Sequence, residues 1–230
     1  MSIEYVEVAR AESERGEVLL RERRDPERGA NAPAVLELRV NGVFVMDTLE
    51  TNSEKAIATA ALQQVDHPRA VVVGGLGLGF TMHEVLADQR VEKLVVVEVE
   101  EALIQWMRDG TVPHGPSYLA DERLTVMGAD IRIAMAEATP AAYDLILLDV
   151  DNGPGFMVHA ANAPLYERDF LMQTRASLRP GGALAIWSAS EAADLRREMN
   201  DVFGNVVPIP YEVTLQRREE QYWIYLARNS

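Results

Sequence analysis

The spacing of apolar residues along the 230-residue chain changes near residue 52. Before that point, short segments alternate apolar and polar residues, as strands do when one face of a sheet is covered. Asn41-Gly42 separates two of these segments, and this dipeptide is a strong signal for a tight β-hairpin. The pattern predicts an N-terminal antiparallel β-hairpin unit over residues 1–52, with strands at residues 4–10, 17–24, 34–40 and 43–47.

Beyond residue 52, segments of helical periodicity alternate with short apolar runs. Ser53 can cap an alanine-rich helix that reaches about Val65. The alternation predicts a Rossmann-like α/β fold over residues 53–230, in which helices cover both faces of a doubly wound, mostly parallel sheet. The expected strands lie at residues 70–74, 93–98, 124–127, 143–149 and 182–187, and the expected helices at residues 79–88, 100–108, 130–137, 167–178 and 190–203.

The last segments of the chain break this alternation. Residues 206–213 and 222–227 are apolar enough for strands, and the polar residues 216–220 lie between them. A polar turn between two such segments is typical of an antiparallel hairpin. We therefore expect an antiparallel C-terminal strand pair at one edge of the sheet.

Composition narrows the class of partner. A formal net charge of −14 repels nucleic-acid backbones and anionic membranes, so we expect neither as a partner. No run approaches the roughly 18 apolar residues of a membrane span, and the first residues lack the features of a signal peptide, so a cytoplasmic location is expected. The chain has no cysteine and its four histidines show no metal-ligand spacing, so no metal is expected. The basic cluster of Arg21, Arg23, Arg24 and Arg28 is interpreted as a solvated face.

A glycine-rich turn follows the first apolar run of the α/β region. The run ends at Gly74, and Gly75, Gly77 and Gly79 follow at alternate positions. Glycines directly after a buried strand let the backbone turn sharply and approach a ligand closely, although a tight turn without a ligand would also use them. Phe80 stands where dinucleotide sites place their last glycine, and no lysine follows as in a triphosphate-binding loop. This spacing suits a nucleoside-bearing cofactor without phosphate, such as S-adenosylmethionine or its decarboxylated form.

Acidic residues follow three further expected strands. Glu98 lies about 20 residues beyond the glycines, where a Rossmann-type site places an acid on a ribose. Asp130 can accept a hydrogen bond from an adenine amino group, or it can simply cap the next helix. Asp149 and Asp151 follow a very apolar strand, and packing does not explain them because unpaired acids are rarely buried. Ligands of open α/β sheets bind at the carboxyl ends of the strands, so these acids and the glycines are expected to form one site.

A loop with glycine, proline and bulky apolar residues follows directly, at residues 152–163. Such a loop beside a site can serve as a lid that excludes water, or it can be a mere connection.

The series of features from about Val35 to the C-terminus resembles the spermidine/spermine synthase family, the polyamine aminopropyltransferases. The most specific stretches are a helix opening, Leu165-Tyr166-Glu-Arg-Asp-Phe170, and a strand entry, Leu178-Arg-Pro-Gly-Gly182. Many methyltransferases share the second stretch, so it says little about the substrate. The resemblance implies a fold of the class I S-adenosylmethionine-dependent transferase type.

The resemblance also implies an activity, the transfer of an aminopropyl group from decarboxylated S-adenosylmethionine to an amine. Glu98 would hold the ribose and Asp130 the adenine edge. Asp149 would correspond to the family's catalytic acid, which orients an ammonium and helps to remove its proton, and a second acid would hold the far end of a diamine. On this basis, cofactor binding is assigned to Gly74, Gly75, Gly77, Glu98, Asp130 and Asp149, catalysis to Asp149 and Asp151, and substrate contact to Asn152, Tyr166 and Trp187.

The chain departs from the family pattern on the polyamine side, so we interpret it as a divergent member. Gly77 replaces the loop Asp that meets the ammonium of the cofactor, and residues 55–57 replace a Tyr-His-Glu motif. Asn152 and Trp187 also stand where the family has other residues. The loop acid would repel the carboxylate that S-adenosylmethionine carries and its decarboxylated form lacks. Loss of this acid therefore favours intact S-adenosylmethionine as the donor, unless another acid, such as Asp151 or Glu84, compensates.

Three functions stay open at this point. The first is an aminopropyltransferase that acts on a small molecule, with a cationic amine as the candidate acceptor. The second is a small-molecule methyltransferase that uses S-adenosylmethionine, and the third is a nucleoside-binding relative without catalysis. The exposed edges of the N-terminal β unit lead us to expect a homodimer that forms through it.

Overall fold

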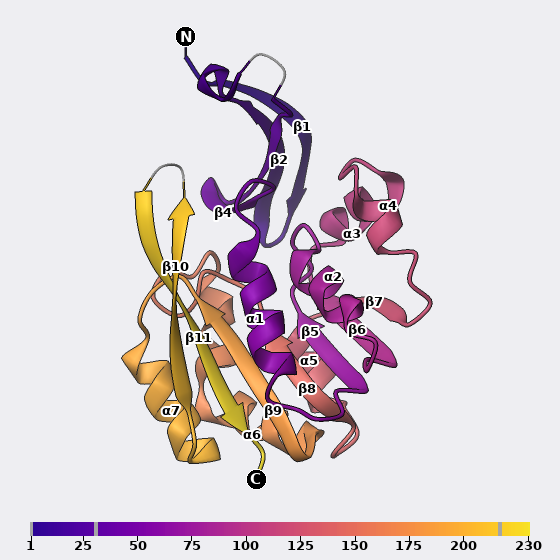
Figure 1. Cartoon of the computed structure of the whole chain (residues 1–230), viewed down its shortest axis with the longest axis vertical. Coiled ribbons are helices and arrows are strands. Elements are labelled where there is room, and N and C mark those ends of the chain that lie inside the picture. Colours follow the sequence, from indigo (N-terminus) through magenta and orange to yellow (C-terminus); the bar gives the residue numbers. More distant parts are fainter. Residues whose placement is uncertain (1, 30–31, 216–217) are drawn as a thin grey trace.

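The structure, a computed structural model, describes residues 2–29, 32–215 and 218–230 of the chain. Two sheets organise these residues: a four-stranded sheet of order β1-β2-β3-β4 and a seven-stranded sheet of order β10-β11-β9-β8-β5-β6-β7. The small sheet projects above the large one, and the first helix runs downward from it across the large sheet (Figure 1).

The small sheet confirms the strands expected before residue 52. Its members are β1 (Glu4–Ser13), β2 (Gly16–Arg24), β3 (Val35–Val40) and β4 (Val43–Asp47), all antiparallel, and a short 3-10 helix, η1 (Pro26–Arg28), follows β2. Asn41 and Gly42 connect β3 to β4 with φ angles of 51° and 76°. Positive φ at both central residues defines the type I′ turn that Asn-Gly favours, so this hairpin forms for the reason that the sequence suggests.

The large sheet confirms the Rossmann-like α/β fold. Its parallel strands are β5 (Ala70–Gly74), β6 (Lys93–Glu98), β7 (Leu124–Gly128), β8 (Tyr143–Leu148) and β9 (Leu178–Ser188). β10 (Val207–Leu215) and β11 (Arg218–Arg228) add the expected antiparallel pair at one edge. β5 pairs in parallel with β6 on one side and with β8 on the other, so the order in which successive strands are added to the sheet reverses beside β5. Open α/β sheets bind their ligands at this reversal.

Helices cover both faces of the large sheet, as a doubly wound fold requires. α1 (Asn52–Leu62), α2 (Phe80–Ala87) and α3 (Glu101–Asp109) contribute to one apolar core. α5 (Ile131–Ala136), α6 (Arg168–Ser177) and α7 (Ala193–Phe203) contribute to the core on the other face. Two short elements, α4 (Gly115–Tyr118) and η2 (Ala160–Tyr166), lie in segments for which no helix was predicted.

Several predicted boundaries are wrong by a few residues. α1 ends at Leu62 rather than near Val65, and β9 begins at Leu178 rather than residue 182. Leu178 already pairs with Tyr143, before the register shifts between Tyr143 and Leu145. The C-terminal hairpin is also longer than predicted, since its strands reach Leu215 and resume at Arg218. The turn predicted at residues 216–220 includes residues 216 and 217, which lie outside the described residues.

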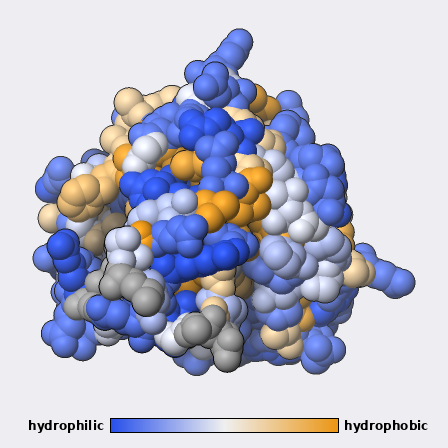
Figure 2. Space-filling model, turned by 90° about the horizontal axis from the view of Figure 1, so that it is seen from above, coloured by the Kyte–Doolittle hydropathy of each residue, from blue (hydrophilic) through white to orange (hydrophobic). Residues whose placement is uncertain are grey.

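The small sheet is packed onto the large one through a shared apolar core. Leu20, Leu38 and Met46 belong to the same buried cluster as Ile57 of α1 and Leu78 beside α2. The division of the chain into separate domains at residues 1–52 and 53–230 therefore stays a prediction. The outer strand, β1, is mostly exposed, and the face seen from above carries apolar patches among hydrophilic residues (Figure 2). Homodimer formation through this sheet also stays a prediction.

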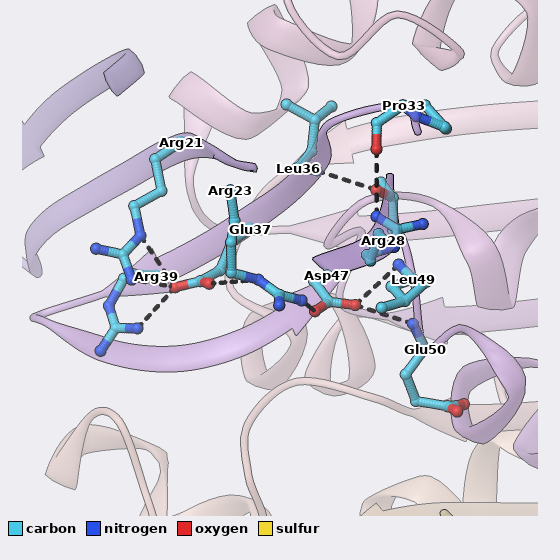
Figure 3. A network of polar contacts seen from close by, with 11 residues as sticks. Arg21, Arg23, Arg28, Pro33, Leu36, Glu37, Arg39, Asp47, Leu49 and Glu50 are labelled. Atoms are coloured by element: carbon cyan, nitrogen blue, oxygen red, sulfur yellow. Dashed lines mark hydrogen bonds and ion pairs between the residues drawn. The ribbon is translucent and has the colours of Figure 1, made fainter. Parts of the chain in front are cut away.

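A buried ionic network inside the small sheet corrects the interpretation of the basic cluster. Glu37 of β3 is fully buried, and Arg21 and Arg39 donate hydrogen bonds to its Oε1 at 2.6 and 2.8 Å (Figure 3). Arg23 is only 5% exposed and pairs with Asp47 at 3.0 Å. Side chains two residues apart share one face of a strand, and the register aligns Glu37 with both Arg21 and Asp47. Arg23 is therefore a buried structural residue and not part of a solvated face.

The network also fixes the chain segment that leads into α1. Asp47 Oδ1 accepts hydrogen bonds from the backbone N–H groups of Leu49 and Glu50 at 2.8 and 2.9 Å (Figure 3). Arg23 holds the other oxygen of the same carboxylate. The start of α1 is thus tied to the small sheet. No helix among the described residues is long and apolar enough to cross a membrane.

We predict that Glu37→Gln lowers the free energy of unfolding by about 3 kcal/mol, because it leaves the partly buried guanidinium groups of Arg21 and Arg39 without their counter-charge. Glu22→Gln is the matched control, since the Glu22 side chain is 30% exposed and pairs with an exposed arginine. It should cost less than about 1 kcal/mol. Urea unfolding of both variants measures the difference, and equal losses would contradict this role of the network.

Candidate active site

A cavity opens at the carboxyl ends of β5, β6 and β8, where the strand order of the sheet reverses. Both sheets form its walls. The large sheet contributes Gly75, Leu76, Gly77, Glu98, Val99, Glu100, Asp149, Val150, Asp151 and Asn152, and the small sheet contributes Arg15, Leu38, Val40, Val45 and Met46. The N-terminal unit, expected mainly to mediate association, thus supplies part of the candidate site.

Two smaller cavities share walls with this central cavity on different sides. The first, here called the Asp130 cavity, shares Gly75 and Glu98 with the centre and adds Asp130 and Leu165. The second, called the Glu50 cavity, shares further residues with the centre and adds Glu50 among others. Its shared residues are Val45, Met46, Glu54, Asn152 and Trp187, and its own residues are Phe44, Asp47, Glu50, Ser53, Ala189 and Tyr222. The site therefore has room for a ligand at its centre and for extensions in two directions.

The glycine loop makes two close contacts, one with backbone and one with a side chain. A Cβ atom on Gly75, whose φ is +95°, would lie 2.0 Å from the carbonyl oxygen of Asp149. A Cβ atom on Gly77 would lie 2.6 Å from Sδ of Met46, and the N–H of Leu78 donates to the same sulfur at 3.2 Å. The first contact brings the loop onto the end of β8. The second places the thioether of Met46, from the small sheet, where a side chain at position 77 would lie. An apolar group therefore takes the place of the missing loop acid.

Glu98 ends β6 and is buried against the loop. Its two carboxylate oxygens accept hydrogen bonds from the N–H groups of Leu76 and Glu100, both at 2.8 Å. Burial raises the pKa of Glu98, and the two backbone hydrogen bonds act in the opposite direction. Each oxygen can still accept a second hydrogen bond, which is what two ribose hydroxyls need. The ribose role stays a prediction.

Asp130 serves as the N-cap of α5. Its side chain accepts the N–H of Arg132 at 2.8 Å, and hydrogen bonds from the Arg132 guanidinium hold the pKa of this carboxyl below its usual range. The capping alternative is therefore present in the structure. Asp130 also faces the Asp130 cavity beside Glu98, so capping and a contact with adenine are compatible.

Asp149 lies at the floor of the central cavity, directly after β8. Thr81 donates a hydrogen bond to its Oδ2 at 2.6 Å, and burial raises its pKa. No ion pair to Asp149 is found in residues 2–29, 32–215 and 218–230. A partly buried carboxylate without a cation has the properties expected of a functional group rather than a structural one.

Asp151 has a different environment. Its carboxylate accepts three hydrogen bonds from the following loop: from the N–H groups of Asn152 and Val158 at 2.7 and 2.6 Å, and from Nδ2 of Asn162 at 2.7 Å. These contacts organise the loop of residues 152–163, which lines the cavity with four of its members. Direct catalysis by Asp151 stays a prediction, and the geometry favours a role in holding this loop.

The predicted substrate residues are distributed unevenly. Asn152 and Trp187 line the central cavity, and the ring of Trp187 meets that of Tyr222 edge-on at 4.9 Å. The indole Nε1 of Trp187 is buried and has no hydrogen-bond partner among the described residues. Tyr166 is buried and is not among the lining residues described above, and neither is Gly74, which packs behind the loop. Their direct contact with a ligand stays a prediction.

Glu54 is the residue that the sequence analysis missed. It lies in the first turn of α1, is only 8% exposed, and lines both the central and the Glu50 cavity. Burial and the neighbouring Asp149 raise the pKa of Glu54 to about 8. A signal was available, because Glu54 shares its helical face with the buried Ile57, Ala58 and Ala61, at the spacing of an apolar stripe.

Arg15 is a second lining residue without a sequence signal. It lies in the turn between β1 and β2, where its side chain meets Glu100 at 3.3 Å and donates to Asn162 Oδ1 at 3.2 Å. Ser13 Oγ donates to the same glutamate at 3.3 Å. The turn is thus joined to the end of β6 and to the loop after β8. Among the described residues, no group of His, Asp and Glu side chains is arranged to hold a metal ion.

Comparison with known proteins places the chain in a family. The α/β fold and a site of acids at the strand ends are typical of nucleoside-dependent transferases. A model of the spermine/spermidine synthase domain matches residues 50–209, well over half of the chain. The chain therefore belongs to the spermine/spermidine synthase family.

Relatives with different named activities match the chain. Polyamine aminopropyltransferase 2 of Pseudomonas aeruginosa is 30% identical over 168 residues, which cover 68% of this chain and 46% of that protein. Putrescine N-methyltransferase 3 of Nicotiana tabacum is 28% identical over 131 residues, which cover 56% of this chain and 32% of that protein. The chain thus spans less than half the length of these two curated relatives.

Solved structures confirm the fold. A crystal structure of spermidine synthase with the transition state analogue AdoDATO matches with a TM-score of 0.81 and 17% identity, over 97% of this chain and 74% of that chain. Spermidine synthase from Thermotoga maritima matches with a TM-score of 0.78 and 16% identity, over 97% and 72% of the two chains. Identities this low establish the architecture alone.

We predict that Gly75→Ala destabilises the protein by about 1–3 kcal/mol more than Gly204→Ala, because both glycines have positive φ but only Gly75 faces a backbone atom. Among the described residues, no atom lies near the Cβ position of Gly204, so this variant isolates the contribution of the φ angle. Thermal or urea unfolding compares the two variants. Equal destabilisation would contradict the close contact between the loop and the end of β8.

We predict that Glu54→Gln changes how stability depends on pH. Folding raises the pKa of Glu54 from 4.5 to about 8, so the folded protein retains a proton that the unfolded chain loses. Stability is therefore lost as the pH rises through this window, at up to about 1.4 kcal/mol per unit. The amide that Glu54→Gln introduces does not titrate, so the stability of this variant rises relative to that of the wild type as the pH increases. The effect is measured as unfolding free energies between pH 5 and 8, with the exposed Glu137→Gln as control. Parallel curves of stability against pH for Glu54→Gln and the wild type would refute the prediction.

Proposed function

We propose that the protein is a transferase that binds an adenosyl-sulfonium donor and moves the donor's aminopropyl group to an amine. The observation that carries this proposal is Asp149, a partly buried carboxylate with no cation beside it in the described part of the chain, which faces the central cavity beside the glycine loop. Membership of the spermine/spermidine synthase family supports the same class of reaction.

The donor would extend from the Asp130 cavity into the central one. Glu98 has free acceptor capacity toward ribose hydroxyls, and Asp130 and Leu165 border the space beyond it. Gly75 and Gly77 expose the loop backbone at the central cavity, where the sulfonium end would lie. The donor supplies an electrophilic carbon next to its sulfonium, and the protein residues bind and orient it.

Asp149 would act on the amine. Amines of this kind are protonated at neutral pH and cannot attack until a proton is removed. A carboxylate in a water-poor cavity attracts the ammonium and accepts a proton from it, and its raised pKa makes it a better base than an exposed acid. Thr81 donates a hydrogen bond to Oδ2 and so restricts how the carboxylate can rotate.

Methyl transfer from intact S-adenosylmethionine is the second candidate. Its support is the similarity to putrescine N-methyltransferases and the absence of an acid at position 77. Against it, the cavity presents Asp149 near the glycine loop, and the ionised form of this acid would repel the carboxylate of that donor. The names of the relatives on both sides include an amine acceptor, so the acceptor class is common to the two candidates.

We predict that methylthioadenosine, the product left after aminopropyl transfer, binds the protein, and that Asp149→Asn spares this binding while turnover falls by about 100-fold or more. The exposed Asp201→Asn is the control and should keep both properties. Calorimetry measures binding, and product analysis after incubation with each donor measures transfer. Failure of methylthioadenosine, S-adenosylmethionine and its decarboxylated form to bind would end both candidates, and full turnover by Asp149→Asn would remove Asp149 as the base.

A further inference from the structure

Glu54 occupies the junction between two cavities. It lines the central cavity with Asp149, and it lines the Glu50 cavity with Glu50 and Tyr222. It is absent from the walls of the Asp130 cavity, toward which the nucleoside would extend. A molecule that reaches Asp149 from the side opposite the nucleoside therefore passes Glu54.

The polar contacts of Glu54 leave its charge uncompensated. Its side chain accepts a hydrogen bond from Ser53 Oγ at 2.8 Å, and in the part of the chain that the structure describes it forms no ion pair. Thr81 lies between the two acids, because its hydroxyl contacts the backbone oxygen of Glu54 as well as Asp149. Asp149 is close enough to raise the pKa of Glu54, and two interacting acids with little water around them are stable only if one is protonated or a cation joins them.

The Glu50 cavity has the chemistry of an aliphatic ammonium site. Val45, Met46 and Trp187 offer apolar surface for methylene groups. Asp47 is neutralised there by Arg23, which leaves Glu54 and Glu50 as acids without an arginine partner among residues 2–29, 32–215 and 218–230. An indole face also attracts a cation directly. The walls thus match a chain of methylenes with a positive charge near Asp149.

We propose that Glu54 is the second acid of the active centre, and that Glu54 and Asp149 form a carboxyl pair that binds the reacting amine of the acceptor. This inference rests on the proposed function, because it assigns a residue to the acceptor side of that same site. From the sequence, catalysis was assigned to Asp151 beside Asp149, and Asp151 or Glu84 was considered as a substitute for the loop acid that meets the donor's ammonium. Asp151 holds its own loop, and Glu84 accepts a hydrogen bond from Thr59 outside the cavity walls described above.

The pair has a consistent proton balance. Before binding, the pair holds one proton, which we assign to Glu54 because burial and the neighbouring Asp149 raise the pKa of Glu54 to about 8. An arriving ammonium stabilises both carboxylates, so the proton of Glu54 leaves to solvent. The pair then takes one proton from the ammonium, and the freed nitrogen lone pair attacks the carbon beside the sulfonium. The C–S bond electrons go to sulfur, and the new secondary ammonium keeps two protons. The pair ends as it began, with one proton released per turnover.

The experiment measures acceptor binding to protein saturated with methylthioadenosine. The probe is 1,4-diaminobutane, titrated calorimetrically at pH 7 in buffers of different ionisation enthalpy, which reports protons released. The variants are Glu54→Gln and, as matched control, Glu84→Gln, which removes an acid of the neighbouring helix outside the cavity. Affinity for methylthioadenosine is measured separately for each protein.

We expect the wild type and Glu84→Gln to release close to one proton when the diamine binds. Glu54→Gln should bind the diamine at least about tenfold more weakly, release no proton, and keep its affinity for methylthioadenosine. Unchanged diamine affinity and proton release in Glu54→Gln would overturn the inference. A loss of methylthioadenosine affinity in this variant would also overturn it, because Glu54 would then belong to the donor side. If the wild type itself fails to bind methylthioadenosine, that result contradicts the proposed function, on which this inference rests.

Discussion

Two carboxyl groups at one cavity, one buried and one partly buried, with no cation from the described residues to balance them, are the constraint around which this structure is organised. Asp149 and Glu54 come from different layers of the fold, one from the end of β8 and the other from the first turn of α1. Water would stabilise both charges, but burial removes it and raises the pKa of each acid. A protein keeps such a pair where a positively charged ligand completes it.

The small sheet makes this arrangement possible. Its ionic network joins Arg23 to Asp47, and Asp47 in turn holds the backbone just before α1 (Figure 3). The same sheet presses Met46 against Gly77 and reaches over the central cavity with Arg15. A unit that looks like an appendage in the sequence is therefore a wall of the site and a support for Glu54.

Local sequence signals predict much of the fold and several residues of the site. Apolar runs, glycines and acids at strand ends predict the order of the elements, and the structure brings Gly75, Glu98 and Asp149 together at one cavity. These signals work because parallel strands end at a common edge. The turn at Asn41 and Gly42 followed from backbone preferences alone.

The missed features depend on contacts between distant segments. Arg23 resembled a surface residue because its partner Asp47 lies in another strand, and burial of that pair depends on sheet register. Arg15 meets Glu100 across many intervening residues, so no local pattern indicates it. Glu54 did leave a trace in the helical spacing of α1, but an acid on an apolar face is informative only once the opposite wall of the cavity is known.

The most direct test is a crystal structure of the protein with methylthioadenosine and 1,4-diaminobutane. We predict that the nucleoside lies across the ends of β5, β6 and β7, and that one diamine nitrogen lies within hydrogen-bond distance of both Glu54 and Asp149. A diamine bound away from these two side chains, or a nucleoside bound outside this crevice, would contradict it.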